Sequence, residues 1–298
     1  MKKVRIHYLF IATFALLSLS SCTEDDPIEQ NVIDEEVLDP NNTINTVFDG
    51  KIFSIPSPVQ TAYLIKSLDL SFDEGLGNDP NNVNNYISEQ QQALNLGIYS
   101  TDLGYSALYN QKNTTLNYLS SLQVLTNELG LDVAFTDDFL KEFEKNTDND
   151  RIMIQLMSDA FKTADNFLKS ANRKPASALI LTGGWIESMY LACELNAKNP
   201  NDEIRKRIGE QKQTIGTIID ILTEYNPKGM NDELITSMQS LSETFNRVSI
   251  SHEYVAPETD KENKTTIFRN QTEVSIEENV LSEILEKVES IRLSIIKK

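Results

Sequence analysis

Apolar residues recur every three or four positions along most of the chain after residue 57, and this spacing is typical of amphipathic α-helices. Stripes of this kind predict helices near residues 57–70, 86–110, 112–129, 137–145, 153–171, 175–199, 202–225, 234–248 and 281–295. The segments between most of them are short, which favours antiparallel neighbours. We therefore predict an all-α fold, an antiparallel helical array of about eight or nine helices.

The helical pattern is interrupted between residues 253 and 276. Residues 265–268 (TTIF) have high β-propensity, and residues 273–276 (EVSI) alternate polar and apolar side chains. Alternation with a period of two is typical of a strand that is buried on one face. We expect a short hairpin or extended excursion before the last helix.

Two of the predicted helices resemble each other. When residues 93–110 are aligned with residues 178–195, five positions are identical and Asp102 falls on Glu187. A long helix and then a helix that begins with acidic residues follow each segment. This order suggests two related helical units, residues 86–171 and 175–296.

The first residues follow a different pattern. Three basic residues precede an uncharged apolar stretch at residues 8–21, which is the layout of a secretory signal. The stretch is shorter than the roughly 20 residues that an α-helix needs to cross a bilayer. Residues 1–21 are therefore predicted to be a cleaved signal peptide.

The end of this stretch, Leu19-Ser20-Ser21-Cys22, resembles a bacterial lipobox. The resemblance implies cleavage before Cys22 and diacylglycerol on its thiol. The acidic residues 24–26 that follow resemble the surface-export signal of Bacteroidota lipoproteins, although they could equally begin a solvated tether. The resemblance is limited to residues 1–26, and it implies a lipid anchor in the outer membrane, facing the cell surface or the periplasm.

The chain is acidic, with 27 Lys and Arg against 45 Asp and Glu and a net charge of −18 in 298 residues. Residues 22–50 hold nine acids and no base, which predicts a flexible acidic tether. Residues 51–298, predicted to be a single helical domain, then carry a charge of −12. This balance argues against a nucleic-acid partner, because such a partner requires a basic face. Lipidation of Cys22 leaves Cys193 without a disulfide partner, and we expect it in the core.

Two acids stand out because each is alone in a long uncharged segment. Asp102 is the single charge between Ala93 and Gln111, and Glu187 is the single charge between Pro175 and Cys193. A buried carboxylate is costly unless it is paired, hydrogen-bonded or protonated. Nearby in the sequence are four large aromatic side chains, Tyr99, Tyr105, Trp185 and Tyr190, and four glycines, Gly97, Gly104, Gly183 and Gly184.

These residues allow two interpretations. In the first, the aromatic residues line a pocket between two central helices, and Asp102 and Glu187 bind a polar or cationic group there. In the second, the glycines allow close helix packing, and the acids are satisfied by tyrosine hydroxyls or by a Lys or Arg of a neighbouring helix. Paired acids can also hydrolyse glycosides at a suitable separation.

Other candidate motifs are incomplete, and we predict neither a metal nor a cofactor. His252-Glu253 lacks the second histidine of a zinc helix, because position 256 is alanine. We place His252 at a helix end or in a loop. The acidic loop at residues 73–79 does not follow the ligand spacing of an EF-hand, and no phosphate-binding loop is present.

Together these features favour a lipid-anchored envelope protein that is not an evident enzyme. Its helical domain would bind a small ligand or an envelope protein. One alternative is an envelope hydrolase that uses Asp102 and Glu187 as an acid and base pair. Another is a structural subunit of an outer-membrane complex.

Overall fold

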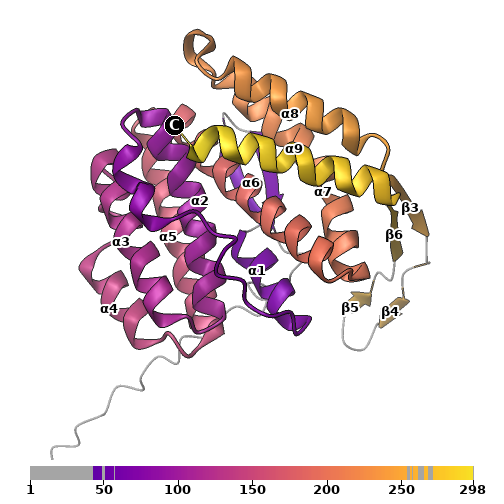
Figure 1. Ribbon diagram of the computed structural model, residues 1–298, viewed down its shortest axis with the longest axis horizontal. Helices are drawn as coiled ribbons and strands as arrows, with labels where there is room; N and C mark the ends of the chain where they lie inside the picture. The colour runs from indigo at the N-terminus through magenta and orange to yellow at the C-terminus, as the bar shows by residue number, and fades with distance from the viewer. Residues whose placement is uncertain are drawn as a thin grey trace, which may run out of the picture. The chain divides into compact units, whose positions relative to one another are not determined.

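A computed structural model of the protein describes residues 43–48, 51–56, 58–253, 256, 258–260, 265–267 and 271–297. Within these ranges the chain forms nine α-helices, two short 3₁₀ helices and three two-stranded antiparallel sheets (Figure 1). The prediction of an all-α helical array is confirmed. The predicted signal peptide, the lipidation residue Cys22 and residues 23–42 of the predicted tether lie outside the described residues.

The helices end close to where the apolar pattern predicts. Their bounds are α1 (Pro58–Ser67), α2 (Glu89–Leu108), α3 (Lys112–Leu129), α4 (Asp137–Lys145), α5 (Asp150–Ser170), α6 (Lys174–Lys198), α7 (Asp202–Glu224), α8 (Asp232–Phe245) and α9 (Glu278–Ile296), with 3₁₀ helices η2 (Pro80–Asn85) and η3 (Pro227–Gly229). Local chemistry fixes several ends. Ser88 and Gln91 form a capping box at the start of α2, and Gly130 ends α3 in the left-handed conformation, with φ of 63°.

Helices α2 and α6 form the centre of the array. Every residue from Gln92 to Leu108 is buried, so α2 is enclosed on all sides. A Cβ atom on Gly183 of α6 would lie 2.0 Å from the carbonyl oxygen of Leu94, and one on Gly97 would lie 2.1 Å from that of Ile180. The two backbones therefore touch where the helices cross. At Gly97 and Gly183 the glycines serve close packing rather than a pocket.

The other helices pack around this central pair. Helix α3 packs on α2, helix α7 packs on α6, and α1 and α5 each contact both central helices. Helix α9 also contacts both, and α8 covers α7 and α9 (Figure 1). The C-terminal helix is thus placed against the two helices that carry Asp102 and Glu187.

The strands form three antiparallel pairs. Strand β3 (Ser249–Glu253) pairs with β6 (Gln271–Ser275), and β4 (Glu258–Asp260) pairs with β5 (Thr265–Ile267) between them. This agrees with the predicted excursion before the last helix. His252, expected at a helix end or in a loop, instead lies on β3 opposite Thr272.

The remaining hairpin lies at the predicted boundary between the tether and the helical domain. Strand β1 (Thr43–Phe48) pairs with β2 (Lys51–Pro56), with Val47 opposite Ile52. Residues 43–48 were expected in the tether, which was predicted to extend to residue 50. Strand β1 therefore falls within the segment that the charge pattern assigns to the tether.

None of the described helices combines the length and the apolar character that a membrane span would require.

Candidate functional site

The two isolated acids meet in the centre of the protein. Asp102 of α2 is 1% exposed and Glu187 of α6 is 0% exposed. Arg292 of α9 donates two hydrogen bonds to Glu187, from Nε to Oε2 at 2.6 Å and from a terminal nitrogen to Oε1 at 2.7 Å. This bidentate geometry is the strongest form of an Arg–carboxylate pair. We call Asp102, Glu187 and Arg292 the buried charge cluster.

The surroundings of Asp102 disfavour its charged form. Its burial and the neighbouring Glu187 carboxylate raise its pKa well above the usual range of an aspartate. Its Oδ2 accepts a hydrogen bond from the backbone N–H of Asn78 at 3.0 Å. Its Oδ1 is buried and has no hydrogen-bond partner among the described residues.

Arg292 also links the cluster to its surroundings. A terminal nitrogen donates to the backbone oxygen of Leu76 at 2.9 Å. Its guanidinium carbon lies 4.2 Å from the centre of the Tyr190 ring, within the range of a cation–π interaction. The arginine therefore connects α9, α6 and the loop before η2.

Buried polar groups hold this loop, residues 70–79, along its whole length. The hydroxyl of Tyr105 accepts a hydrogen bond from the N–H of Asp73 at 3.0 Å, and the hydroxyl of Tyr99 donates to the carbonyl of Asp79 at 2.8 Å. The side chain of Asn78 donates to the hydroxyl of Tyr86 at 2.9 Å. Together with the contacts of Asp102 and Arg292, these bonds fix a segment that has no regular secondary structure.

Gly77 lies where the loop passes most closely over the helices. A Cβ atom at this position would be 2.0 Å from the hydroxyl oxygen of Tyr118 and 3.3 Å from the carboxyl carbon of Asp102. Any side chain would displace the loop or the tyrosine. Gly77 therefore lies against both Tyr118 of α3 and Asp102 of the buried charge cluster.

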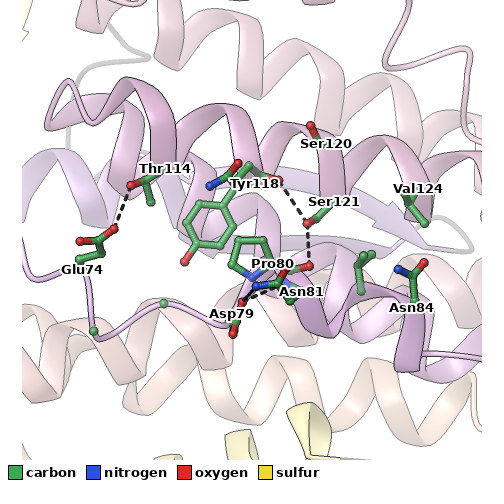
Figure 2. A pocket seen from close by; sticks show the side chains of 14 residues that line it. Glu74, Asp79, Pro80, Asn81, Asn84, Thr114, Tyr118, Ser120, Ser121 and Val124 are labelled. Carbon is green, nitrogen blue, oxygen red and sulfur yellow. Dashed lines mark hydrogen bonds between the residues drawn. The ribbon is translucent and has the colours of Figure 1, made fainter.

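A surface groove lies between this loop, η2 and α3 (Figure 2). Its volume is about 680 Å³, within the range of about 300–1,000 Å³ that is common for ligand pockets. Nine of its 14 lining residues have polar side chains, and the full set is Glu74, Gly75, Gly77, Asp79, Pro80, Asn81, Val83, Asn84, Thr114, Asn117, Tyr118, Ser120, Ser121 and Val124. We call it the Tyr118 groove.

The residues predicted to line one pocket lie in three separate parts of the fold. Glu187 and Tyr190 contact Arg292, as described above, and Asp102 lies close to Glu187. Tyr99 and Tyr105 use their hydroxyls to hold the loop and do not line the Tyr118 groove.

Trp185 lies elsewhere in the fold. It donates to Oε1 of Gln211 on α7 at 3.0 Å. It borders a cavity of only about 10 Å³, which is about the space of one water molecule.

The arrangement of the two acids favours a structural role. A general acid or base must come within hydrogen-bonding distance of its substrate, but both carboxyl groups are almost completely buried. Glu187 is also engaged by Arg292 through both oxygens. For Glu187, this geometry matches the interpretation in which an arginine of a neighbouring helix satisfies the acid.

Arg292 and Tyr118 were not among the predicted site residues. Arg292 follows Val288 by four positions and therefore lies on the apolar stripe of its helix, a place where a charge signals a buried partner. Tyr118 gave no such signal, since it falls on the apolar stripe of α3 and looks like an ordinary core residue.

The acidic loop at residues 73–79 uses its carboxylates for other purposes. Asp73 accepts a hydrogen bond from Lys198 at 2.6 Å, and this bond lowers the pKa of Asp73. Asp79 caps η2 through the N–H of Asn81 at 2.9 Å. Among the residues that the structure describes, no group of three or more His, Cys, Asp or Glu side chains has the arrangement of a metal site.

Cys193 lies in the core, as predicted. It is 2% exposed, and burial raises the pKa of its thiol. A thiol that stays protonated and inaccessible is a poor nucleophile.

Comparisons of the chain with protein-family models, with curated proteins and with solved structures give no match.

Proposed function

We propose that this protein is a lipid-anchored envelope protein whose helical body binds a small polar ligand in the Tyr118 groove. The observation that carries the binding role is the groove itself. It has the volume of a ligand pocket, about 680 Å³, and one wall is a loop without regular structure that the buried charge cluster and several tyrosines fix in place. A fixed wall lowers the entropy cost of binding.

The proposed location depends on the sequence. The basic start, the apolar segment of residues 8–21 and Cys22 support export and lipidation. Mass spectrometry of the mature N-terminus tests this part of the proposal. We expect a diacylglycerol-modified cysteine at residue 22, and an unmodified Cys22 would contradict the anchor.

A binding role is favoured over hydrolysis by the state of the acids. Arg292 engages Glu187 and Asn78 donates to Asp102, and neither acid contributes a side chain to the groove. Their inferred role is to support the wall of the groove, not to act on a substrate.

Filling the groove tests the binding role. Ser120 is exposed and lines the groove from α3, so we expect Ser120→Trp to block it without disturbing the core. Asn127→Trp is the matched control, since Asn127 is also exposed on α3 but does not line the groove. Ligand-observed NMR with mixtures of amino acids, amines, sugars and carboxylates provides the measurement.

At least one compound is expected to bind the wild-type protein and the Asn127→Trp variant and to lose at least tenfold in affinity for Ser120→Trp. If every compound binds Ser120→Trp as it binds the wild-type protein, or if none binds at all, the groove is not a ligand site. Thermal denaturation of both variants shows that each is folded.

A further inference from the structure

The charged side chains that line the Tyr118 groove are all acidic. Two of its 14 lining residues, Glu74 and Asp79, are acidic, and none is Lys, Arg or His. No described Lys or Arg forms an ion pair with either carboxylate, whereas the neighbouring Asp73 is paired with Lys198. The groove therefore presents two carboxylates whose charge no described basic side chain neutralises.

Both carboxylates keep an oxygen available. Glu74 accepts a hydrogen bond from the hydroxyl of Thr114 across the groove, at Oε1 and 3.4 Å. Asp79 uses Oδ1 for the N–H and the side chain of Asn81, each at 2.9 Å. Within the described part of the chain, Glu74 Oε2 and Asp79 Oδ2 accept no hydrogen bond. Both side chains are exposed, so a ligand can reach these atoms.

Tyr118 supplies an independent observation. Its side chain is 4% exposed, yet its hydroxyl makes no hydrogen bond with any described residue. In Figure 2 this hydroxyl points from α3 toward the loop that carries Glu74 and Asp79. Burial raises the pKa of Tyr118, so the hydroxyl stays neutral and can accept a hydrogen bond. Tyr118 lines the groove, so a ligand bound there can hydrogen-bond to this hydroxyl.

We propose that the Tyr118 groove binds a small organic cation, with an ammonium group held by the Asp79 carboxylate and the Tyr118 hydroxyl. Glu74 would hold a second cationic group in a diamine. The N–H groups of an ammonium only donate hydrogen bonds. They match the two carboxylates and the Tyr118 hydroxyl, each of which has an oxygen that accepts no hydrogen bond from a described residue. Anionic ligands would meet two like charges. This inference rests on the proposed binding function and names its ligand class.

Isothermal titration calorimetry with putrescine tests the inference, with 1,4-butanediol as a neutral probe of the same carbon chain. We expect putrescine to bind the wild-type protein at least tenfold more tightly than the diol. Because ionic contacts at a surface are screened by salt, the affinity for putrescine should fall several-fold between about 50 mM and 500 mM NaCl. Equal affinity for the two probes, or no effect of salt, would overturn the inference.

Charge-removing variants assign the binding to the groove. Asp79→Asn keeps a side-chain oxygen that can cap η2, and Glu74→Gln keeps the shape of the side chain. Each is expected to weaken putrescine binding at least fivefold. Glu144→Gln, which removes an exposed acid on α4, should leave the affinity unchanged. Equal effects of all three variants would show only a general response to net charge and would contradict the site.

The outcome separates this inference from the proposed function. If a sugar or a carboxylate binds in a manner sensitive to Ser120→Trp while putrescine does not bind, the groove is a ligand site and the cationic ligand class is wrong. If no compound, putrescine included, is sensitive to Ser120→Trp, both proposals fail.

Discussion

Replacing Arg292 by methionine is expected to lower the free energy of unfolding by about 3–5 kcal/mol. The substitution leaves Glu187, which is 0% exposed, as a buried charge without its cation. It also removes the donor to the carbonyl of Leu76 and the cation over the ring of Tyr190. Urea denaturation at neutral pH, followed by circular dichroism, measures the change.

Two further variants identify the cause of the loss. In the double variant Arg292→Met/Glu187→Gln, no uncompensated charge remains, so at least half of the lost stability should return. Arg205→Met is the control, because Arg205 forms an ion pair at 2.9 Å with Glu278, an exposed residue of α9. This substitution should lower the free energy of unfolding by only about 0–1 kcal/mol. If Arg292→Met costs no more than Arg205→Met, the buried pair does not contribute as described.

Gly183→Ala is expected to destabilise the protein by about 3 kcal/mol, at the upper end of the usual effect of overpacking. The added Cβ atom would lie 2.0 Å from the carbonyl oxygen of Leu94 and 2.9 Å from its carbonyl carbon. These are backbone atoms, so relief requires that α2 and α6 move apart.

Gly216→Ala is the matched control for Gly183→Ala. Gly216 lies within α7, and a Cβ atom there meets no atom within 4 Å. Because alanine favours the helix over glycine by about 0.5–1 kcal/mol, this control is expected to stabilise the protein. Thermal and urea denaturation compare the two variants, and effects of the same sign would show that the close approach of α2 and α6 is not the cause.

The helices could be predicted from the sequence because each depends on local information. The apolar stripes and end signals such as Thr136 and Gly130 lie within the segments that they define. The isolated positions of Asp102 and Glu187 correctly indicated burial, since a single charge on an enclosed helix has no route to solvent.

The site was harder to predict because its contacts join distant parts of the chain. Leu76 and Arg292 are 216 positions apart, and no local pattern connects them. The Tyr118 groove depends on the path of a loop, which is set by these tertiary contacts and not by periodicity.

The sequence does contain a signal for the hairpin of β1 and β2, but the acidic composition of the segment favoured a tether instead. Residues 43–48 (TINTVF) are rich in β-branched side chains, and Asp49-Gly50 separates them from residues 51–56. This dipeptide is favoured in two-residue hairpin turns. Its acidic residue was counted instead as part of the tether.

The central claim is that the buried charge cluster fixes the loop that forms one wall of the Tyr118 groove. Hydrogen exchange at the amide of Asn78 tests it most directly, because this buried N–H donates to Asp102 at 3.0 Å. In Asp102→Ala the acceptor is lost, and exchange should be at least tenfold faster than in the wild-type protein. In Asp102→Asn the side-chain oxygen remains, and protection should be close to that of the wild-type protein. Equal protection in Asp102→Ala and the wild-type protein would contradict the claim.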